Sequence, residues 1–485
     1  MAQETPTDKL RVLYFALGTR GDVMPGVSVC RALQSMGHST LFVSSPNYRE
    51  SVEAYGLTFA SCCTTGWQWR NEFSYLSEEE VEEMLVTQDP KRFLDIFGER
   101  GLPWNLCQIQ PEACHGLKKI MDAENFDVVY TNVCSSFTGL RVVKKAQESR
   151  NVVFISSNFS PGMHVVTGSN VPIGYTKSKY GWINRLKHMH NMFTIFFPAI
   201  AALPEMKKSQ EEVLKVEGID KSSEMSLAMV LASETCLGMW SPALFPPQPD
   251  YEKTLIVTGA ALAPAPPGWK PSAALEAFMQ RRDGEGRPPV VVDFGSMPAG
   301  MHLQERVATI LANLGFNVCL QVGASKEAVR KDFGVLDSID GELDAKCPNI
   351  FRVNFVSHDW LFPKASVLVC HGGAGTLQRC LMAGTPIVIC PMVAVIICDQ
   401  RWHGRFVDTE GLGTMIPTLK PTEDDVKVAV DKALACKEAC VAMSKKMLEQ
   451  EDGAVVTARE IQRVAFEKRD AYAKKSSQKG CFGFK

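Results

Sequence analysis

Apolar and polar positions alternate in blocks along the first third of the chain. The apolar run Val12–Leu17 has the length of a buried strand, and apolar residues then recur at helical spacing from Val29 to Met36. Gly37 follows at the position where a helix often ends in a residue of left-handed backbone conformation. The next apolar run is Leu41–Val43. This order predicts a strand–helix–strand unit. Further strands are expected at 128–130 and 152–155, as in a parallel sheet covered on both faces.

The same alternation restarts in the second half of the chain. Short apolar runs separated by helical patterns predict a second α/β sheet there, with strands at Val290–Phe294, Val318–Val322, Ile350–Val353, Val367–Cys370 and Ile387–Cys390. Between the halves, residues 241–269 are rich in proline, which resists helix and sheet interiors. These patterns predict an N-terminal domain (1–240), a linker (241–269), a C-terminal domain (270–468) and a flexible tail (469–485).

The composition narrows the class of protein. With 485 residues, 45% of them hydrophobic, the chain is long enough for two or three globular domains. The net charge of -2 argues against a polyanion-binding surface, so nucleic acid is not an expected partner. The apolar stretch Met192–Leu203 is shorter than the ~20 residues that span a bilayer. We expect a protein that touches a membrane peripherally at most.

The cysteines and the N-terminus bear on compartment and metal binding. Residues Met1–Lys9 are polar and lack the apolar segment of a signal peptide, so the protein is expected in the cytoplasm. The thiols of its sixteen cysteines are therefore expected to be reduced. No Cys-x-x-Cys pair occurs, and no structural metal is expected.

The strongest chemical signal is the glycine-rich stretch 370–376, Cys-His-Gly-Gly-Ala-Gly-Thr, between an expected strand and a helical pattern that ends at Gly384. Small residues let backbone N–H groups approach an anion, and a helix N-terminus adds about half a positive charge. Phosphate is the ligand this arrangement favours. The alternative is a tight turn that merely lets the helix pack on the sheet.

Polar side chains also follow three other expected strands: Asp22, Ser296, and Asp399 with Gln400. Ligands of open α/β sheets gather outside the carboxyl ends of strands, where Asp399 and Gln400 would be placed to hold polyol hydroxyls. Ser296 would be placed to donate to a phosphate, and Asp22 to accept a proton from a hydroxyl nucleophile. Each has a structural alternative, since the aspartates could cap helices and Ser296 could end a strand in a turn.

Four ordered motifs carry a family resemblance: Gly18–Pro25, Ser357–Pro363, His371–Thr376 and Asp399–Gln400. In their order and spacing the chain resembles UDP-sugar-dependent glycosyltransferases. It looks most like the sterol glucosyltransferase branch, which is similar to the glycopeptide-antibiotic glycosyltransferases. The resemblance covers roughly residues 10 to 465 and is most specific in the C-terminal half.

The resemblance implies a GT-B fold, in which two facing Rossmann-like domains with parallel sheets enclose a central cleft. The N-terminal domain would bind the acceptor and the C-terminal domain a UDP-sugar, with no further cofactor and no metal. It also implies the donor contacts. The diphosphate would be held by His371, Gly373, Ala374, Gly375, Thr376 and Ser296, the sugar by Asp399 and Gln400, and the uracil near Phe355 and Val356.

On the acceptor side, the resemblance makes Asp22 the catalytic base, in a glycine-rich loop with Gly18, Thr19, Arg20 and Gly21. The sterol and antibiotic branches place an aspartate there. A hydroxyl would attack the anomeric carbon from the face opposite the diphosphate, so inversion is expected. The sequence contains no Asp-x-Asp tripeptide, the pattern through which other glycosyltransferases hold a divalent ion.

The acceptor is expected to be a sterol or a similar lipophilic alcohol. Aromatic and methionine side chains gather in residues 60–110 and 159–204, where they suit a pocket for a flat lipophile. For each of them a place in the core is the alternative. Basic and aromatic residues in 187–197 would let that segment rest on a lipid surface. A glycosyltransferase for another lipophilic small molecule is a second possibility.

Three positions depart from the family pattern. Cys370 stands where a second histidine is usual, Met392–Cys398 replaces an aromatic, glycine-containing turn, and Asp293 places an acid in an expected buried strand. The expected function is inverting transfer of a hexose, glucose by resemblance. The alternative is a non-catalytic protein that kept the fold and binds nucleotide sugars, which the altered segment before Asp399 favours.

Overall fold

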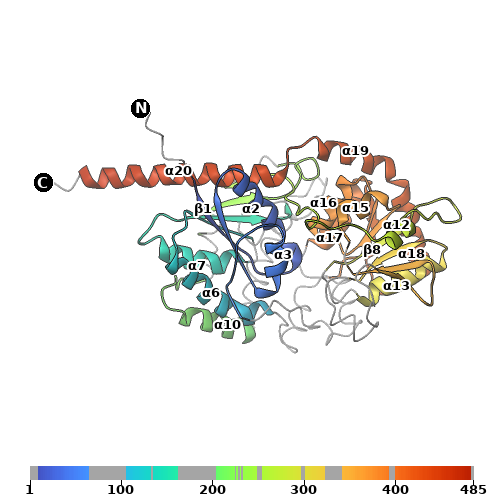
Figure 1. The fold of residues 1–485 in the computed structure, drawn as a ribbon, viewed down its shortest axis with the longest axis horizontal. Helices are drawn as coiled ribbons and strands as arrows, with labels where there is room; N and C mark the ends of the chain where they lie inside the picture. The colour runs from blue at the N-terminus through green and yellow to red at the C-terminus, as the bar shows by residue number, and fades with distance from the viewer. Residues whose placement is uncertain are drawn as a thin grey trace, which may run out of the picture.

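The computed structural model describes residues 9–64, 105–132, 135–161, 204–223, 226–227, 230, 233–247, 254–295, 301–322, 341–354, 356–392 and 399–481. They form two α/β domains, each built on a seven-stranded sheet (Figure 1).

The N-terminal sheet is parallel throughout, with strand order β3-β2-β1-β4-β5-β6-β7. Its strands are β1 (Arg11–Phe15), β2 (Ser39–Ser44), β3 (Phe59–Ser61), β4 (Val128–Asn132), β5 (Val153–Asn158), β6 (Thr235–Gly238) and β7 (Leu255–Val257). The four strands expected in the first third are confirmed as β1, β2, β4 and β5. Along β1, Val12 and Tyr14 enter one core cluster while Leu13 and Phe15 enter another. This is the burial on both faces that a continuous apolar run requires.

The C-terminal sheet has the order β10-β11-β9-β8-β12-β13-β14, and only the edge strand β10 is antiparallel among the described strands. Its strands are β8 (Val290–Asp293), β9 (Val318–Gln321), β10 (Glu342–Leu343), β11 (Ile350–Val353), β12 (Leu368–Cys370), β13 (Ile387–Ile389) and β14 (Gly413–Met415). All five strands expected in this half are confirmed. In both sheets the chain starts in the middle, runs to one edge and crosses back, which is the Rossmann-like order.

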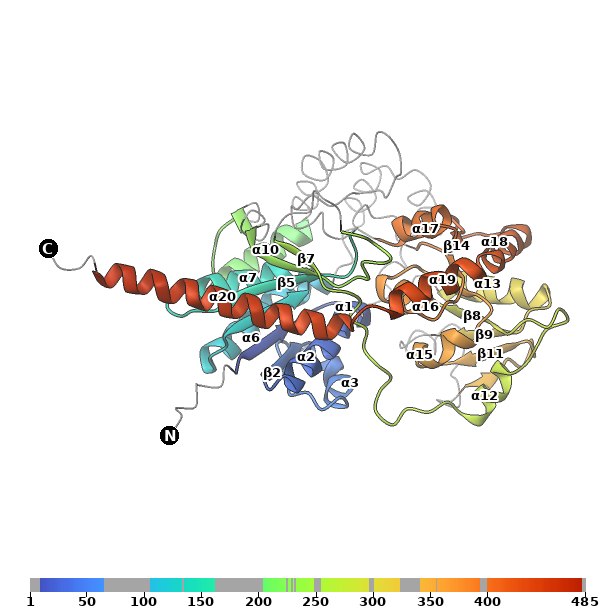
Figure 2. The ribbon, with the colours of Figure 1, turned by 90° about the horizontal axis from the view of Figure 1, so that it is seen from above.

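Helices connect the strands and cover both sheets (Figures 1 and 2). In the N-terminal domain they are α1 (Arg20–Val23), α2 (Pro25–Ser35), α3 (Arg49–Glu53), α6 (Asn105–Ala123), α7 (Ser136–Ala146) and α10 (Pro204–Lys215). The later helices are α12 (Ala273–Met279), α13 (Met301–Asn313), α15 (His358–Leu361), α16 (Ala374–Met382), α17 (Gln400–Thr409), α18 (Glu423–Ala435), α19 (Lys437–Leu448) and α20 (Gly453–Cys481). The expected left-handed residues Gly37 and Gly384 have φ of 89° and 66°.

The last helix crosses from one domain to the other. Figure 2 shows α20 lying along the N-terminal domain, far from the sheet that precedes it in sequence. Its buried residues Ala454, Ala458, Ile461, Val464 and Ala465 join the core cluster of β1 and α2. Their spacing of three or four residues makes one apolar stripe. The helix also continues through Cys481, into residues 469–485 that were expected to be a flexible tail, because Ala, Lys and Gln favour helix.

The proline-rich segment 241–269 differs from the expected linker in one respect. Its Leu255–Val257 run forms β7, which adds to the N-terminal sheet by pairing with β6. Outside β7, the described residues of the segment include some that pack in the core of each domain, Ala261 in the N-terminal one and Leu244 and Phe245 in the C-terminal one. The Pro264 carbonyl accepts a hydrogen bond of 2.8 Å from Tyr55 of the N-terminal domain, and the Ala263 carbonyl accepts one from Arg379 of α16.

Candidate functional site

The candidate residues follow the carboxyl ends of strands in both sheets, and the two edges meet. Asp22 follows β1, Ser160 follows β5, His371 follows β12 and Asp399 follows β13. The hydroxyl of Ser160 donates a hydrogen bond of 3.2 Å to Oδ2 of Asp399, which joins the two domains across 239 positions of sequence. The carboxyl edges of the two sheets therefore face each other, at the position where open α/β sheets bind ligands.

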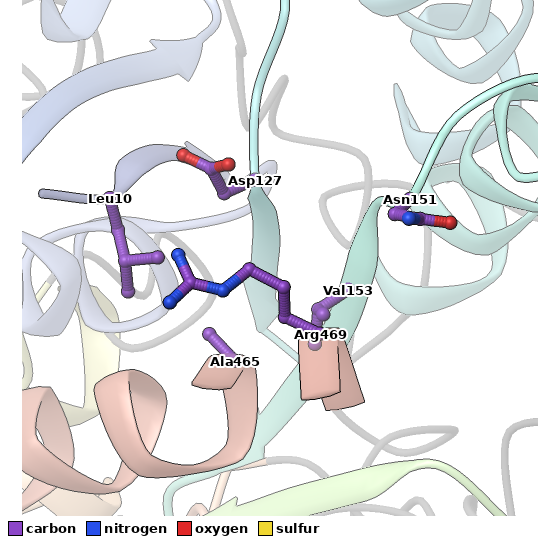
Figure 3. Close-up of a pocket in the computed structure, with 6 residues that line it drawn as sticks. All are labelled: Leu10, Asp127, Asn151, Val153, Ala465 and Arg469. Atoms are coloured by element: carbon purple, nitrogen blue, oxygen red, sulfur yellow. The ribbon is translucent and has the colours of Figure 1, made fainter. Parts of the chain in front are cut away.

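A cavity of about 250 Å³ lies at the opposite edge of the N-terminal sheet (Figure 3). It is lined by residues at the amino ends of the strands and by α20: Leu10, Asp127, Asn151, Val153, Ala465 and Arg469. The cavity is therefore separate from the facing strand ends and takes no part in the candidate site.

The glycine-rich stretch after β12 turns directly into helix α16. Gly373 is its N-cap residue, with extended backbone and no side-chain cap, so the first N–H groups of the helix receive no capping bond from it. A Cβ on Gly373 would lie 2.6 Å from Nε2 of His371, whereas one on Gly375 would meet nothing within 4 Å. The turn thus serves close packing at Gly373 and leaves open space at Gly375. Ala374 and Thr376, the other expected phosphate contacts, are partly exposed beside it.

His371 lies between this turn and the end of β8. Burial lowers the pKa of His371, despite the carboxylates of Asp293 and Asp399 nearby, so the imidazole is neutral at pH 7. Its Nδ1 atom is buried and has no hydrogen-bond partner within the described part of the chain. A neutral imidazole beside an uncapped helix start offers one N–H donor to an anion without bringing a full charge.

Asp399 occupies the N-cap position of α17, but its side chain makes no capping hydrogen bond. Besides Ser160, its carboxylate lies 3.8 Å from Nδ1 of His403, one turn along the helix. The same Nδ1 lies 2.7 Å from the carbonyl oxygen of Gly372, to which it donates. His403 is fully buried and so ties the glycine-rich turn to α17. The alternative that Asp399 only caps the helix is therefore not what the structure shows.

Gln400 is buried beside Asp399. Its Oε1 accepts a hydrogen bond of 2.8 Å from the backbone N–H of Met392, which fixes the chain as it leaves β13. The expected contact of Gln400 with a sugar stays a prediction.

Asp22 lies in the short helix α1, where its carboxylate closes a local turn. Oδ2 of Asp22 accepts hydrogen bonds from the backbone N–H of Thr19 at 2.7 Å and from its hydroxyl at 2.8 Å. A Cβ on Gly18, which has a φ of 127°, would lie 2.5 Å from that oxygen. Asp22 thus forms the capping turn that was the structural alternative for it, and its role as a base stays a prediction. Asn132, at the end of β4, holds the backbone carbonyl of Asp22 at 2.9 Å.

Arg20 and Gly21 complete the acceptor-side loop. Gly21 is exposed and Arg20 is partly buried. Burial lowers the pKa of Arg20, an effect that Tyr55 and Tyr48 oppose and that Arg379 of α16 adds to. Because Arg379 belongs to the other domain, this loop lies near the interface between the domains.

Several expected contacts are not tested by the geometry. Ser296, Phe355 and most of the aromatic segments 60–110 and 159–204 lie outside the described residues. Val356 is buried, and its N–H donates to Oε1 of Gln321 at 3.0 Å, so its place beside a base stays a prediction.

Sequence reasoning missed Ser160, Asn132 and His403. Only His403 carries a local signal, because it lies four residues after Asp399 on a helical pattern. Among the described residues, no group of three or more His, Cys, Asp and Glu side chains is arranged to hold a metal ion. No helix in the described ranges is both long and apolar enough to cross a bilayer.

Two family models match this chain. The N-terminal domain of glycosyltransferase family 28 matches residues 12–92, and the C-terminal domain of the same family matches residues 300–458. Each half of the chain therefore matches one of the two domains of glycosyltransferase family 28.

Among curated proteins, the chain is similar to sterol 3-beta-glucosyltransferases. It is 24% identical over 452 residues to that of Vanderwaltozyma polyspora and 24% identical over 453 residues to that of Saccharomyces cerevisiae. Each match covers 92% of this chain but 34% of the relative. The chain thus spans about a third of the length of these relatives.

Solved structures confirm the GT-B fold. The glycosyltransferase of kitacinnamycin matches with a TM-score of 0.59 and 18% identity, covering 94% of this chain and 98% of that one. The calicheamicin glycosyltransferase CalG4 matches with a TM-score of 0.56 and 15% identity, covering 94% and 98%. VinC, solved in complex with dTDP, matches with a TM-score of 0.57 and 16% identity, covering 94% and 100%.

Proposed function

We propose that this chain transfers a hexose, glucose in the first instance, from a UDP-sugar to the hydroxyl of a sterol or similar lipophilic acceptor, with inversion. The observation that carries the proposal is the meeting of the two carboxyl edges through Ser160 and Asp399. It brings the loop of Asp22 and the glycine-rich turn of His371 to opposite sides of one interface.

On the donor side, the departing diphosphate needs stabilisation as its charge develops. The uncapped start of α16 and the neutral imidazole of His371 supply fixed donors of the kind that contribute several kcal/mol, roughly 3, per donor in a closed site. The open space over Gly375 leaves room for a phosphate. Thymidine diphosphate in the related structures of VinC and SsfS6 supports a nucleoside diphosphate as the donor's leaving group.

On the acceptor side, Asp22 would take the proton of the attacking hydroxyl. The backbone N–H and the hydroxyl of Thr19 donate to Oδ2 of Asp22 and hold the carboxylate in a fixed orientation, as proton transfer to a positioned base requires. Attack from this side of the interface, opposite the diphosphate, inverts the anomeric centre. No metal ion and no other cofactor enters this scheme.

The acceptor class and the location rest on the relatives and the sequence. The sterol 3-beta-glucosyltransferases among them support a sterol acceptor. A sterol is held in a membrane, so we place the reaction in the cytoplasm, at a membrane surface that the protein contacts peripherally.

A second candidate is a protein that binds nucleotide sugars without turnover. Two side chains expected to act in the reaction are engaged in structural hydrogen bonds, Asp22 with Thr19 and Gln400 with Met392. This candidate predicts donor binding without acceptor-dependent release of UDP.

The test is acceptor-dependent UDP release from UDP-glucose with a panel of sterols. We expect release by the wild type and a loss of about a hundredfold or more in Asp22→Ala, the scale of general-base catalysis. Asp122→Ala is the matched control, because it removes an exposed carboxylate of α6 far from the interface. If the wild type releases no more UDP with any acceptor than Asp22→Ala does, the binding protein is the better description.

A further inference from the structure

A buried carboxylate lies at the carboxyl end of β8, next to the candidate diphosphate site. Asp293 has an exposed fraction of 0% and pairs in register with Cys370 and Gln321 on the neighbouring strands. Its Oδ1 accepts a hydrogen bond of 2.8 Å from the N–H of Gly295, and its Oδ2 lies 2.7 Å from Nε2 of His358. A buried charge without partners is strongly destabilising, so these two contacts explain how the acid is tolerated.

The turn that Asp293 holds forms one wall of the His371 site. Gly295 has a φ of 61°, and a Cβ on it would lie 3.1 Å from Cε1 of His371. Displacement of this turn would therefore move the imidazole or release it. His358 lies on the other side of the carboxylate and is stacked on Phe362 with ring centroids 4.3 Å apart. Asp293 thus contacts one imidazole, that of His358, and holds the turn that lies against the other, that of His371.

We propose that Asp293 is a positioning residue for the diphosphate of the donor. It acts through Gly295 and His358, and so fixes His371 beside the start of α16. The ligand in this inference, a nucleoside diphosphate, rests on the proposed function, while the assignment of Asp293 goes beyond it.

The ionisation of the neighbouring groups is consistent with this role. Burial acts to raise the pKa of Asp293, but the His358 imidazole, the Gly295 amide and His371 together hold it below its ordinary value. The other titratable groups facing it are the thiols of Cys319 and Cys370, which burial keeps protonated by raising their pKa values.

A purely electrostatic role and a positioning role of Asp293 predict opposite effects on UDP binding when the acid is neutralised. If Asp293 acted only as a negative charge near an anionic ligand, Asp293→Asn would strengthen UDP binding. If it positions the site, the same change weakens binding. The N–H of Gly295 donates to Oδ1, and Nε2 of His358 lies in ion-pair contact with Oδ2. An asparagine offers one oxygen for these two contacts. Either Gly295 or His358 therefore loses its oxygen partner.

The experiment compares UDP with uridine by calorimetry on the full chain. We expect Asp293→Asn to weaken UDP binding about tenfold, the lower end of what outer partners of ligand-binding histidines cost in metal sites, and to leave uridine binding unchanged. The imidazole nitrogen signals of His358, assigned by comparison with His358→Gln, should shift in nitrogen-correlated NMR spectra because the ring loses its contact with a carboxylate oxygen.

Asp283→Asn is the matched control. Asp283 is a second buried acid that holds a turn, accepting from the N–H groups of Glu285 and Arg287, but it lies before the amino end of β8. This variant should lower the thermal unfolding midpoint as Asp293→Asn does, without any selective loss of UDP binding.

Unchanged or tighter UDP binding by folded Asp293→Asn would overturn the inference, as would an equal loss of UDP and uridine. If Asp293→Asn does not fold, His358→Gln carries the test with the same expected selective loss. A wild type that binds no nucleoside diphosphate would contradict the donor of the proposed function and this inference together. Wild-type binding of UDP without a selective loss in the variants contradicts the inference alone.

Discussion

Gly372, Gly373 and Gly375 lie within four residues of one another, yet their missing side chains serve different purposes. A Cβ on Gly372 would lie 2.6 Å from Ile389, and one on Gly373 equally close to His371, so these two glycines are required by packing. A Cβ on Gly375 would meet nothing, although the residue lies in the first turn of α16. Packing therefore gives no reason for a glycine at this third position.

Gly375→Ala should separate ligand binding from stability. We expect the thermal unfolding midpoint to stay or rise, because alanine in a helix is favoured over glycine by up to about 1 kcal/mol. UDP binding should weaken by about tenfold or more, equivalent to about 1.4 kcal/mol, because the new methyl group fills the space over the helix start. Calorimetry with UDP and a melting curve on the same sample check both.

Gly373→Ala provides the contrast. It should lower both the melting midpoint and UDP affinity, since its Cβ meets the imidazole of His371. If Gly375→Ala binds UDP as the wild type does, the start of α16 is not the diphosphate site.

For single residues, the sequence predicted which positions lie at the site better than what each side chain does there. Asp22 and Asp399 both precede or begin helices, so capping was the alternative for each. Asp22 does hold its own turn through Thr19, whereas the Asp399 carboxylate makes no capping hydrogen bond and accepts one from Ser160. The partner of Asp399 lies 239 positions away, and no local pattern could identify it.

Among the elements, the central strands were predictable because each is buried on both faces and so reads as an unbroken apolar run. The short edge strand β7 was not, since its three residues lie within a proline-rich segment. The packing of α20 on the N-terminal domain could not be predicted from the sequence either. Its stripe of small and apolar residues shows that one face is buried, but the surface that it covers belongs to a domain built more than 400 positions earlier.

Removal of packing under α20 should affect the N-terminal domain. Ile461 is fully buried in the cluster of β1 and α2, so Ile461→Ala should destabilise by about 2 to 5 kcal/mol. Hydrogen exchange should accelerate in α2 and β1 and stay unchanged in β12 and β13. Val428→Ala, on the exposed surface of α18, is the matched control and should change neither. Faster exchange in the C-terminal strands alone would contradict this account of α20.

At the scale of the whole molecule, the two domains are joined by more than the linker. The contact between Ser160 and Asp399 lies at the facing edges, and the linker carbonyls accept hydrogen bonds from both sides. The sequence predicted two such domains from their separate strand patterns. It could not predict how they meet, because the contacts are made by single polar side chains.

Stability should depend on pH through His371. Burial lowers its pKa, so the unfolded chain binds more protons than the folded one once the pH falls below about 6.5, and stability is lost on acidification. Asp293 affects stability at lower pH. Its pKa in the folded protein is lowered from 3.8, so the stability that its ionised form contributes is lost only as the pH falls below 3.8 and through that lowered pKa.

The melting midpoint of the wild type should therefore decrease as the pH is lowered from 7.5 to 5.5. For this one proton, the free energy of unfolding changes by at most about 1.4 kcal/mol per pH unit. The melting midpoint of His371→Gln should decrease less over the same pH range. An equal decrease in both proteins would show that other groups control the acid response.

The position of α20 also has a consequence for biosynthesis. A ribosome delivers the N-terminal sheet first, yet the helix that closes one of its faces is made more than 400 positions after β1. Until α20 has emerged, the nascent domain carries an uncovered apolar surface over α2. The N-terminal half can therefore reach its finished form only once α20 has emerged, and chaperones that shield apolar surface can bind there in the meantime.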